Sequence, residues 1–371
     1  MTKIVILGEN IPSNLLRYFF EQESITYDGF KFQTKENNNA QYLAIRPSFF
    51  VWFENFFNEN FVKFYPVNSI KLYSKEKKFF DISSSDGSYK HLFHMIKNHD
   101  IYDFFEQKKL SNIKNIREKD QFLIDQKNQI ITCGKDSYEY DLLINCDPKF
   151  NTLLGIHEIT HNYDEVAITA SFSTTNPTYN MAKQFFLKDS IFAFLPHADN
   201  EFSIVWSCQK DLFNYISKLS TKAFINEISN ILKIQSKSIQ MIDKRVSFPL
   251  HHMINEPNQN KNIISLGSAA HQIHPLAGQG LNLSLKDVMV LIEILGPKLR
   301  INTKNIFDTE RVIKEFKLNR ELEVSFIGKL TKVIDWFAMR DKDGINLFRE
   351  KTLLFFNNIN ILKKIILRSV S

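Results

Sequence analysis

The chain has 371 residues, of which 43% are hydrophobic and 24% are charged, and its formal net charge at pH 7 is +6. This composition is typical of a globular protein that is long enough for two domains. The positive charge is spread along the chain, without a long basic run or basic residues interleaved with aromatic ones, which argues against a nucleic-acid partner.

The cysteines and the apolar segments indicate the compartment. Cys133, Cys146 and Cys208 lie far apart and form no Cys-x-x-Cys pair, so we expect reduced thiols in the core of a cytoplasmic protein. The first residues have neither the basic nor the apolar region of a signal peptide. No apolar run approaches the roughly 20 residues that a membrane-spanning helix needs. We therefore expect a cytoplasmic protein that meets any lipid at the inner face of the membrane.

The beginning of the chain predicts a β-α-β unit. Residues 3–8 read KIVILG, a buried parallel strand, residues 14–22 read as a helix, and residues 24–33 contain a second strand. Such an opening often binds the ADP half of a dinucleotide through a turn of the form G-x-G-x-x-G. Here the turn reads GENIPS, so only its first glycine, Gly8, is kept, and Glu9 brings a negative charge to the place expected for pyrophosphate.

The next segments mix helices and short strands. Residues 48–57 predict an aromatic-rich core helix, and residues 61–80 predict short strands that cross into a second domain. His91 and His94 are spaced three apart on an expected helix. A metal pair is one interpretation of this spacing, but no third ligand lies nearby, so we favour a helix that packs on the core.

The middle of the chain predicts mostly strands. Residues 121–146 read as a ladder of short strands, and residues 163–207 as antiparallel strands of period two that form one wall of an aromatic pocket. Residues 212–235 are expected to be helical, and residues 244–250 to return as a strand. We place Arg245 at the solvated edge of that strand.

Residues 261–297 are the stretch around which the chain is organised. An apolar strand at 263–266 runs through a turn of small residues at 267–280 into a helix with apolar residues at helical spacing, and Gly296-Pro297 predicts its end. A helix terminus placed after such a turn presents free N–H groups and a positive dipole end to an anion or a polar ligand edge. An ordinary buried corner is the alternative, and it would have little use for Gln279 and Asn282 beside two glycines.

The end of the chain is predicted to be helical. Residues 307–323 form a charged helix in which Arg311 to Arg320 lie on an exposed face, and an apolar segment follows at 327–339. Residues 345–370 predict a helical pair whose last segment is apolar and basic. That pattern suits a membrane-surface or partner-docking helix, and also a helix packed on its own domain, which we favour.

The sequence GSAAHQIHPLAGQGLNLSLKD, residues 267–287, resembles the flavin-contact motif of FAD-dependent aromatic hydroxylases. Within that family it is similar to the ubiquinone-biosynthesis hydroxylases, which carry G-(D/N)-A-A-H-x-x-x-P-x-A-G-Q-G-x-N-x-G-x-x-D, and the match has no gap. The resemblance implies a mixed α/β fold like that of para-hydroxybenzoate hydroxylase, with a Rossmann-type FAD domain, an inserted antiparallel-sheet substrate domain and C-terminal helices. It assigns residues 1–66, 89–162 and 258–345 to the FAD-binding domain, 67–88 and 163–257 to the substrate domain, and 346–371 to a C-terminal helical segment.

The resemblance also implies roles for individual residues. Pro275 is expected to form the wall that faces the reaction site, with Gln279 as the second catalytic residue. Ser268 stands where many relatives have an aspartate. His271 and His274 form a His-x-x-His pair, but the surrounding motif favours a hydrogen-bonding role over a metal site, so we expect no metal. The expected contacts to the cofactor are Gly8, Gln41, Asp147, Gly267, Ser268, His271, Gly278, Gly280, Leu281 and Asn282.

Several positions depart from the family pattern. An arginine usually follows the polar loop at 37–41, where this chain has Gln41, with Arg46 close enough to substitute. The acidic residue expected to hold the ribose is missing, and Gln33 is the nearest candidate. The second fingerprint of the family, an apolar strand ending in A-D-G and followed by arginine, keeps its aspartate. It has proline at the glycine position and Leu154 at the arginine position.

The resemblance implies an FAD-dependent monooxygenase that uses NAD(P)H and O₂ to hydroxylate a polyprenylated phenol in ubiquinone biosynthesis. Other proteins of that pathway, and the membrane surface, are then the expected partners. The alternative is a catalytically impaired paralogue that serves as a structural subunit of a ubiquinone-biosynthesis assembly, which the departures on the ADP and reductant side support. We favour the enzyme, because a scaffold has little reason to keep Gly278, Gln279, Gly280 and Asn282 together.

Overall fold

The computed structural model describes residues 2–33, 42–57, 63–74, 77–87, 90–117, 121–156, 158–255, 262–272, 279–300 and 308–339. The chain divides into two compact units. The first contains Met1–Asn38, Ile101–His161 and His251–Leu330, and the second contains Asn39–Asp100, Asn162–Leu250 and Thr331–Ser371. The expected C-terminal segment, 346–371, lies outside the described residues.

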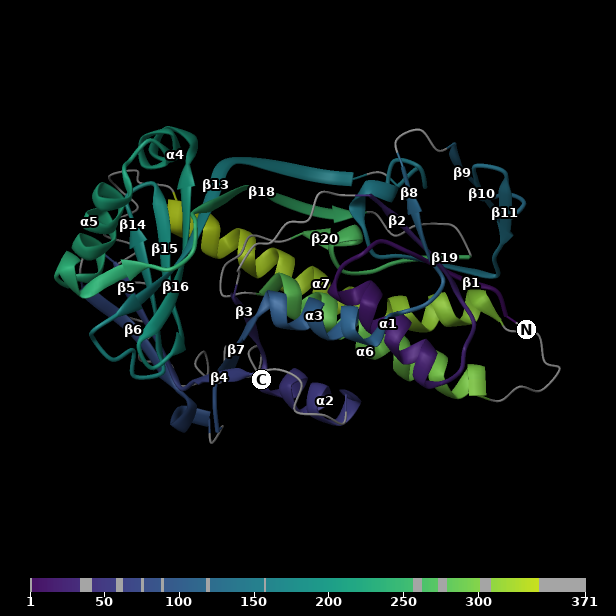
Figure 1. The fold of residues 1–371 in the computed structure, drawn as a ribbon, viewed down its shortest axis with the longest axis horizontal. Coiled ribbons are helices and arrows are strands. Elements are labelled where there is room, and N and C mark those ends of the chain that lie inside the picture. Colours follow the sequence, from purple (N-terminus) through teal and green to yellow (C-terminus); the bar gives the residue numbers. More distant parts are fainter. Residues whose placement is uncertain are drawn as a thin grey trace. The chain divides into compact units, whose positions relative to one another are not determined.

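The first unit is built on a five-stranded parallel sheet with the strand order β19-β12-β1-β2-β8 (Figure 1). Its central strand, β1, is apolar and fully buried, as expected for a parallel strand covered on both faces. The strands are β1 (Ile4–Leu7), β2 (Asp28–Phe32), β8 (Ile113–Ile116), β12 (Leu142–Asn145) and β19 (Ile263–Ser265). A small antiparallel sheet consists of β9 (Phe122–Asp125), β10 (Ile130–Cys133) and β11 (Asp136–Glu139).

Helices α1 (Ile11–Gln22) and α6 (Gln279–Arg300) pack side by side in this unit (Figure 1). The predicted end of α6 at Gly296-Pro297 is wrong, because the helix continues through Pro297 to Arg300. A proline in the last turn removes only one hydrogen bond, and the buried Ile294 and Leu295 just before it keep this turn packed. The other helices that contribute are α3 (Asn98–Lys108) and α7 (Thr309–Met339).

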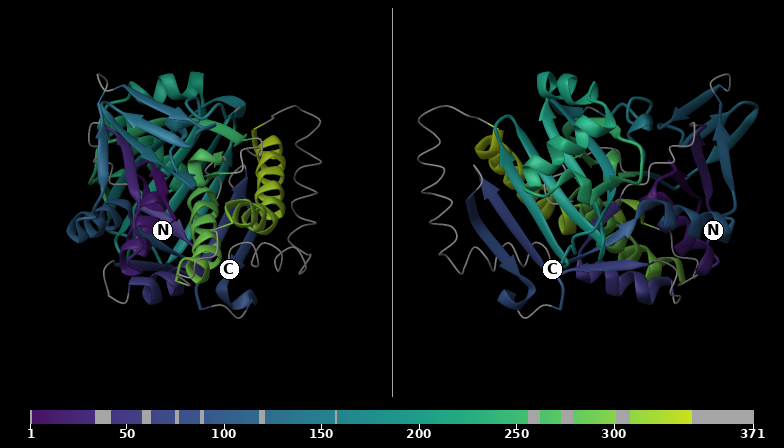
Figure 2. Two further views of the ribbon diagram at one scale, coloured as in Figure 1. Left: turned by 90° about the vertical axis from the view of Figure 1, so that its right-hand side faces the viewer. Right: turned by 60° about the vertical axis from the view of Figure 1, so that its left-hand side comes forward.

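The second unit contains a mainly antiparallel sheet, whose strands are drawn in blue and teal in Figure 2. Its strand order is β13-β16-β15-β14-β5-β6. The antiparallel strands expected over 163–207 are therefore confirmed. Helices α4 (Lys210–Ser217) and α5 (Thr221–Leu232) pack against an aromatic core that includes Phe172 and Phe202, whose ring centroids lie 5.3 Å apart. The strands are β5 (Ser69–Ser74), β6 (Lys77–Ser83), β13 (Glu158–Thr174), β14 (Met181–Leu187), β15 (Ser190–Ala198) and β16 (Glu201–Gln209), with β17 (Ile239–Met241) paired to β13.

A small sheet of β3 (Tyr42–Ile45), β7 (Phe93–Lys97) and β4 (Phe64–Val67) also belongs to the second unit, together with α2 (Pro47–Phe57). The domain boundaries therefore differ from those inferred from the sequence. Residues 39–66 and 89–100 were expected in the FAD-binding domain but belong to the second unit. The reason is that β3 and β4 both pair with β7, which ties these segments to one another.

The helix predicted around His91 and His94 is also wrong, because residues 93–97 form strand β7. A short run of buried residues has no periodicity that separates a strand from a helix. His94 is buried and stacks on Phe50, with ring centroids 4.3 Å apart, while His91 Nδ1 lies 2.7 Å from Asn68 Oδ1. In the described part of the chain, no three His, Cys, Asp or Glu side chains gather as a metal site.

Arg245 does not lie at a solvated edge. It is half-buried, and its guanidinium donates to the carbonyls of Ile216, at 3.3 Å, and Leu219, at 2.7 Å. These carbonyls lie at the C-terminal end of α4 and just beyond it, where a cation is favoured by the helix dipole. The guanidinium also lies 4.8 Å from the ring centroid of Phe224. Arg245 precedes β18 (Val246–Asn255) and joins it to the helical layer.

The remaining short elements are η1 (Ser84–Gly87), η2 (Pro148–Phe150), η3 (Ser236–Ser238), η4 (Gly267–Ala269) and β20 (His271–Gln272). All three cysteines are free, with Cys146 and Cys208 buried and Cys133 half-buried. Among the described helices, none is both long enough and apolar enough to span a bilayer.

His94 is expected to make stability depend on pH. Burial, with the charges of His91 and Lys90, lowers the pKa of His94 to about 4. As the pH falls from about 6.5 towards 4, the unfolded chain binds a proton at this histidine that the folded chain does not bind, so the free energy of unfolding decreases. We expect His94→Leu to reduce that loss by about 2 kcal/mol, measured by urea unfolding at several pH values.

The exposed His99 provides the matched control, and His99→Gln should leave the slope unchanged. Some slope should remain in His94→Leu, because burial also lowers the pKa of His197 to about 4. An unchanged slope in His94→Leu would contradict the assignment.

Candidate functional site

The site begins where β19 ends and the chain turns sharply at Gly267. This residue has φ +54°, and a Cβ placed on it would lie 3.0 Å from Ser284 Oγ and 3.2 Å from Pro12 Cγ. A glycine is therefore required both by the left-handed backbone and by the close approach of two helices. Ala270 N–H then donates to the Gly267 carbonyl at 2.9 Å and completes the η4 turn.

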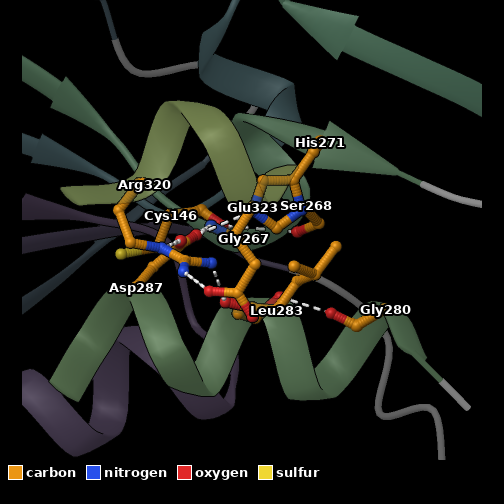
Figure 3. A network of polar contacts seen from close by, with 10 residues as sticks. Cys146, Gly267, Ser268, His271, Gly280, Leu283, Asp287, Arg320 and Glu323 are labelled. Atoms are coloured by element: carbon orange, nitrogen blue, oxygen red, sulfur yellow. Dashed lines mark hydrogen bonds and ion pairs between the residues drawn. The ribbon is translucent and has the colours of Figure 1, made fainter. Parts of the chain in front are cut away.

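The turn is held by the carboxylate of Asp287, which projects from α6 (Figure 3). Oδ2 of Asp287 accepts from the Gly267 N–H at 2.8 Å and lies 2.8 Å from His271 Nε2, while Oδ1 accepts from Arg320 Nε at 2.7 Å. Arg320 also donates to the Leu283 carbonyl at 3.3 Å and pairs with Glu323. One buried carboxylate thus connects η4, β20, α6 and α7.

The electrostatics of this carboxylate are those of a buried ion that is well paired. Burial alone would raise the pKa of Asp287, but the charge and hydrogen bond of His271, the charge of Arg320 and the Gly267 N–H together hold that pKa below its ordinary value. Asp287 is therefore ionised at neutral pH. The sequence analysis placed Arg320 on an exposed face, which is wrong: only 3% of this residue is exposed.

Two buried polar atoms near this corner have no hydrogen-bond partner in the described structure. They are Nδ1 of His271, on β20, and Oγ of Ser265, at the end of β19. A buried polar atom without a partner is costly, and in native proteins it usually marks a ligand, an ion or a water. The corner therefore has two buried polar atoms that the described residues leave available for a hydrogen bond to a ligand or a water.

The end of β12 approaches the same turn through two buried asparagines. Asn145 Nδ2 donates to Asn151 Oδ1 at 2.8 Å, and Asn151 Nδ2 donates to the Ala269 carbonyl at 3.2 Å. Leu266 N–H donates to the Asn145 carbonyl at 2.8 Å. Burial raises the pKa of the adjacent Cys146 thiol to about 12, so this cysteine is neutral and not a nucleophile.

Gly8, just after β1, lies close to Asp147, two residues after the end of β12. Gly8 has φ +112°, and a Cβ placed on it would lie only 2.8 Å from the Cβ of Asp147. Asp147 accepts a hydrogen bond from Lys149 N–H at 3.0 Å and so caps η2. The position where the family has an arginine is Leu154, which is 3% exposed and packs in the apolar core.

The structure brings several of the expected cofactor residues together. Gly267, Ser268, His271, Gly280 and Asn282 lie around the η4–α6 corner, and Ser268 Oγ donates to the Cys146 carbonyl at 3.4 Å. Leu281 follows in the first turn of α6 and is half-buried. Gln41, Pro275 and Gly278 lie outside the described residues, and Gln279 is described only as the first residue of α6.

Sequence reasoning missed the residues that hold the corner in place. Asn145, Asn151 and Arg320 are polar residues in segments that were interpreted as a strand end, a loop and an exposed helix. Asp287 was seen only as the last letter of a motif. The available signal was that Asp287 lies on the same helix face as the buried Leu283 and Leu291, where a charge requires a partner.

Comparisons with known proteins agree with this geometry. A family model described as an FAD binding domain matches residues 158–309. The ubiquinone biosynthesis monooxygenase COQ6 of Danio rerio is 26% identical over 201 residues, which are 45% of this chain and 41% of that protein. Ubiquinone hydroxylase UbiL of Rhodospirillum rubrum is 30% identical over 147 residues, which are 40% of this chain and 34% of that protein. The match spans less than half the length of these relatives.

Solved structures share the fold over nearly the whole chain. The probable FAD-dependent monooxygenase pqsL of Pseudomonas aeruginosa has a TM-score of 0.76 at 12% identity, covering 95% of this chain and 99% of that one. The p-nitrophenol 4-monooxygenase PnpA of Pseudomonas putida has a TM-score of 0.76 at 11% identity, covering 100% and 99%. The fold of this chain is therefore the fold of these two structures.

The expected mixed α/β fold is confirmed. In sequence, less than half of the chain is similar to the ubiquinone-biosynthesis hydroxylases named above.

Asp287→Asn should destabilise the first unit. An amide cannot supply the charge that Arg320 and His271 face, and removing one partner of a buried ion pair costs roughly 3 kcal/mol. Because the folded pKa of Asp287 is lowered, its contribution is present above about pH 4 and is lost as the pH falls through the lower folded value. Urea unfolding at pH 7 and at a series of lower pH values should show the full difference between variant and wild type at pH 7, and a difference that shrinks as the pH falls below about 4.

Asp308→Asn is the matched control. Asp308 is exposed and accepts from Arg311 N–H at 3.0 Å at the start of α7, and asparagine is an equally good cap. An equal loss of stability in the two variants would contradict the role given to Asp287.

Gly8→Ala should destabilise through a backbone clash. The left-handed backbone and the 2.8 Å approach to Asp147 both oppose a side chain, whereas Gly134, with φ +63°, has no atom within 4 Å of its hypothetical Cβ. We therefore expect Gly8→Ala to cost about 2 kcal/mol more than Gly134→Ala in chemical denaturation. Equal costs would mean that the backbone at Gly8 and Asp147 moves apart without a loss of stability.

Proposed function

We propose that this chain is an FAD-dependent monooxygenase that uses NAD(P)H and O₂ to hydroxylate a polyprenylated phenol in ubiquinone biosynthesis. The observation that carries the proposal is the η4–α6 corner. Its turn at Gly267 is fixed by the buried Asp287, it leads to the N-terminus of a long helix, and it lies in a chain whose relatives include ubiquinone hydroxylases.

The residues at the start of α6 fit the ring system of a flavin. The N–H groups at the start of an α-helix have no partner within the helix, and here the first three helical residues are Gln279, Gly280 and Leu281. These amides and the positive end of the helix dipole suit the pyrimidine edge of the ring, where negative charge develops. The unpartnered Nδ1 of His271 adds polar capacity at the same corner.

A bound flavin would supply the activation of dioxygen with electrons from NAD(P)H. The chain's own part is to orient the ring through α6, to keep the carboxylate of Asp287 ionised as a fixed counter-charge to Arg320, and to exclude water. A polyprenylated phenol is lipid-like, so we propose that the protein works at the inner face of the membrane, beside other proteins of the pathway.

A second candidate is a catalytically impaired paralogue that serves as a structural subunit of the same pathway's assembly. The observation that favours it is the remodelling around Asp147. This residue caps its own short helix, and Leu154 packs in the apolar core where a relative would present an arginine. At the position expected to serve the reductant, an apolar side chain has thus joined the core.

Flavin titration monitored by visible absorbance tests the proposal. We expect the purified protein to take up flavin, and Gly280→Trp to abolish uptake, because an indole in the first turn of α6 would occupy the place proposed for the flavin ring. Glu293→Trp on the same helix is the control, since Glu293 is exposed and lies near the other end.

A protein that takes up no flavin even at about 100 μM would favour the structural subunit, since this corresponds to less than about 6 kcal/mol of binding. If flavin binds, the enzyme and the subunit are separated by phenol-dependent oxidation of NADH or NADPH. Uptake without such oxidation for any prenylated phenol would contradict the enzyme.

A further inference from the structure

We propose that Asn10 sets the cofactor specificity of the first unit. Its side chain closes the helix terminus on which a dinucleotide would place its diphosphate, so that recognition is confined to the flavin ring. This inference rests on the proposed function, because it concerns the opposite end of the same cofactor site.

The place in question is the crevice outside the carboxyl end of β1. This strand lies between β12 and β2. The chain continues from β1 to β2 on one side, and from β12 to β19 on the other side, so the strand order reverses here. In open α/β sheets, ligands bind at such a switch point, and a diphosphate lies on the helix terminus that follows the first strand. In this chain that terminus is the start of α1, with Asn10 as its N-cap.

The amides of this terminus are already engaged by the chain itself. Asn10 Oδ1 accepts from Ser13 N–H at 3.1 Å, Ser13 Oγ accepts from Asn10 N–H at 2.9 Å, and Asn14 N–H donates to the Asn10 carbonyl at 3.0 Å. Pro12 has no N–H. Of the first four helical positions, only Ile11 keeps an amide for a ligand, whereas a diphosphate needs several.

The side chain of Asn10 also bridges the crevice. Its Nδ2 donates to the Cys146 carbonyl at 2.5 Å, and the Cys146 N–H donates to the Leu7 carbonyl at 2.9 Å. The loop after β1 is therefore joined to the loop after β12 by both backbone and side chain. The first turn of α1 is buried without any ligand, and Ser13 is 0% exposed. A diphosphate would have to break this bridge to reach the helix.

The charges around the loop oppose an anion as well. Glu9 carries its carboxylate on the exposed side of the loop, where it pairs with Lys31 of β2. Arg17 is fully buried behind the loop, and its guanidinium donates to the Gly8 carbonyl at 2.7 Å and to the Ile6 carbonyl at 3.4 Å. One cation is thus neutralised by a neighbouring carboxylate, and the other faces inward.

These three observations have one consequence for binding. At the ring end, the corner keeps the unpartnered Nδ1 of His271 beside the start of α6, while the dinucleotide end has a capped helix, a hydrogen bond from Asn10 to the Cys146 carbonyl and a carboxylate. The ADP half of FAD should then contribute almost nothing to affinity, and the chain should bind riboflavin and FAD with similar dissociation constants.

Calorimetric titration with ADP, FAD and riboflavin tests the proposal on the full chain. ADP probes the diphosphate end without the ring, and riboflavin probes the ring without the diphosphate. We expect the wild type to bind no ADP at about 1 mM, and to bind FAD and riboflavin within about threefold of each other. In Glu9→Ala/Asn10→Gly, ADP binding should appear, and FAD should bind at least about tenfold more tightly than riboflavin.

The substitution at Asn10 should not unfold the protein, because glycine at an N-cap costs only a few tenths of a kcal/mol relative to asparagine. The control is Ser220→Gly, which removes the cap of α5, where Ser220 Oγ accepts from Ala223 N–H at 3.2 Å. This variant loses a comparable cap in the second unit and should leave all three affinities unchanged.

The outcomes separate this inference from the proposed function. ADP binding by the wild type, or FAD binding more than about thirtyfold tighter than riboflavin, would overturn the inference while leaving a flavin enzyme in place. The inference also falls if Glu9→Ala/Asn10→Gly gains no affinity for ADP. Failure of riboflavin and FAD to bind any of the variants would overturn the proposed function, while a gain of ADP binding in the double variant would still support the closure by Asn10.

Discussion

The structure of the first unit depends on the buried carboxylate of Asp287. It accepts from the Gly267 N–H and from Arg320, and it lies within hydrogen-bond distance of His271, so one side chain fixes a turn, a strand and two helices. An ion of this kind is tolerated in a core only when all its oxygens are well paired. Because the pairing involves four different elements, the Gly267 turn is held against α6 by the chain's own residues.

The η4–α6 corner and the start of α1 differ in whether the chain pairs its own polar groups. At the η4–α6 corner, Nδ1 of His271 and Oγ of Ser265 have no hydrogen-bond partner among the described residues. At the start of α1, the chain satisfies its own amides with the side chains of Asn10 and Ser13. Each exchange of a ligand contact for an internal hydrogen bond stabilises the free protein and weakens the hold on a dinucleotide.

The candidate site was partly predictable. The motif at residues 267–287 identified the corner, because glycine and small residues in a strand–turn–helix pattern restrict what the backbone can do. The parts contributed by Asn145, Asn151 and Arg320 were not predictable, since they reach the corner from segments far away in the chain. His94 and Pro297 were misassigned for a local reason: a run of buried residues and a late proline each permit more than one backbone conformation.

The sequence by itself determined the mixed α/β fold and the strand–turn–helix segment that starts at β19, because these follow from short patterns of apolar, small and glycine residues. Only the tertiary structure decided what became of the degenerate turn after β1. In the sequence, GENIPS lacks two of the three glycines of the G-x-G-x-x-G turn. In the folded chain, Asn10 bridges to the Cys146 carbonyl, a partner 136 positions away in sequence, and a hydrogen bond over that separation exists only once parallel strands have brought the two loops together.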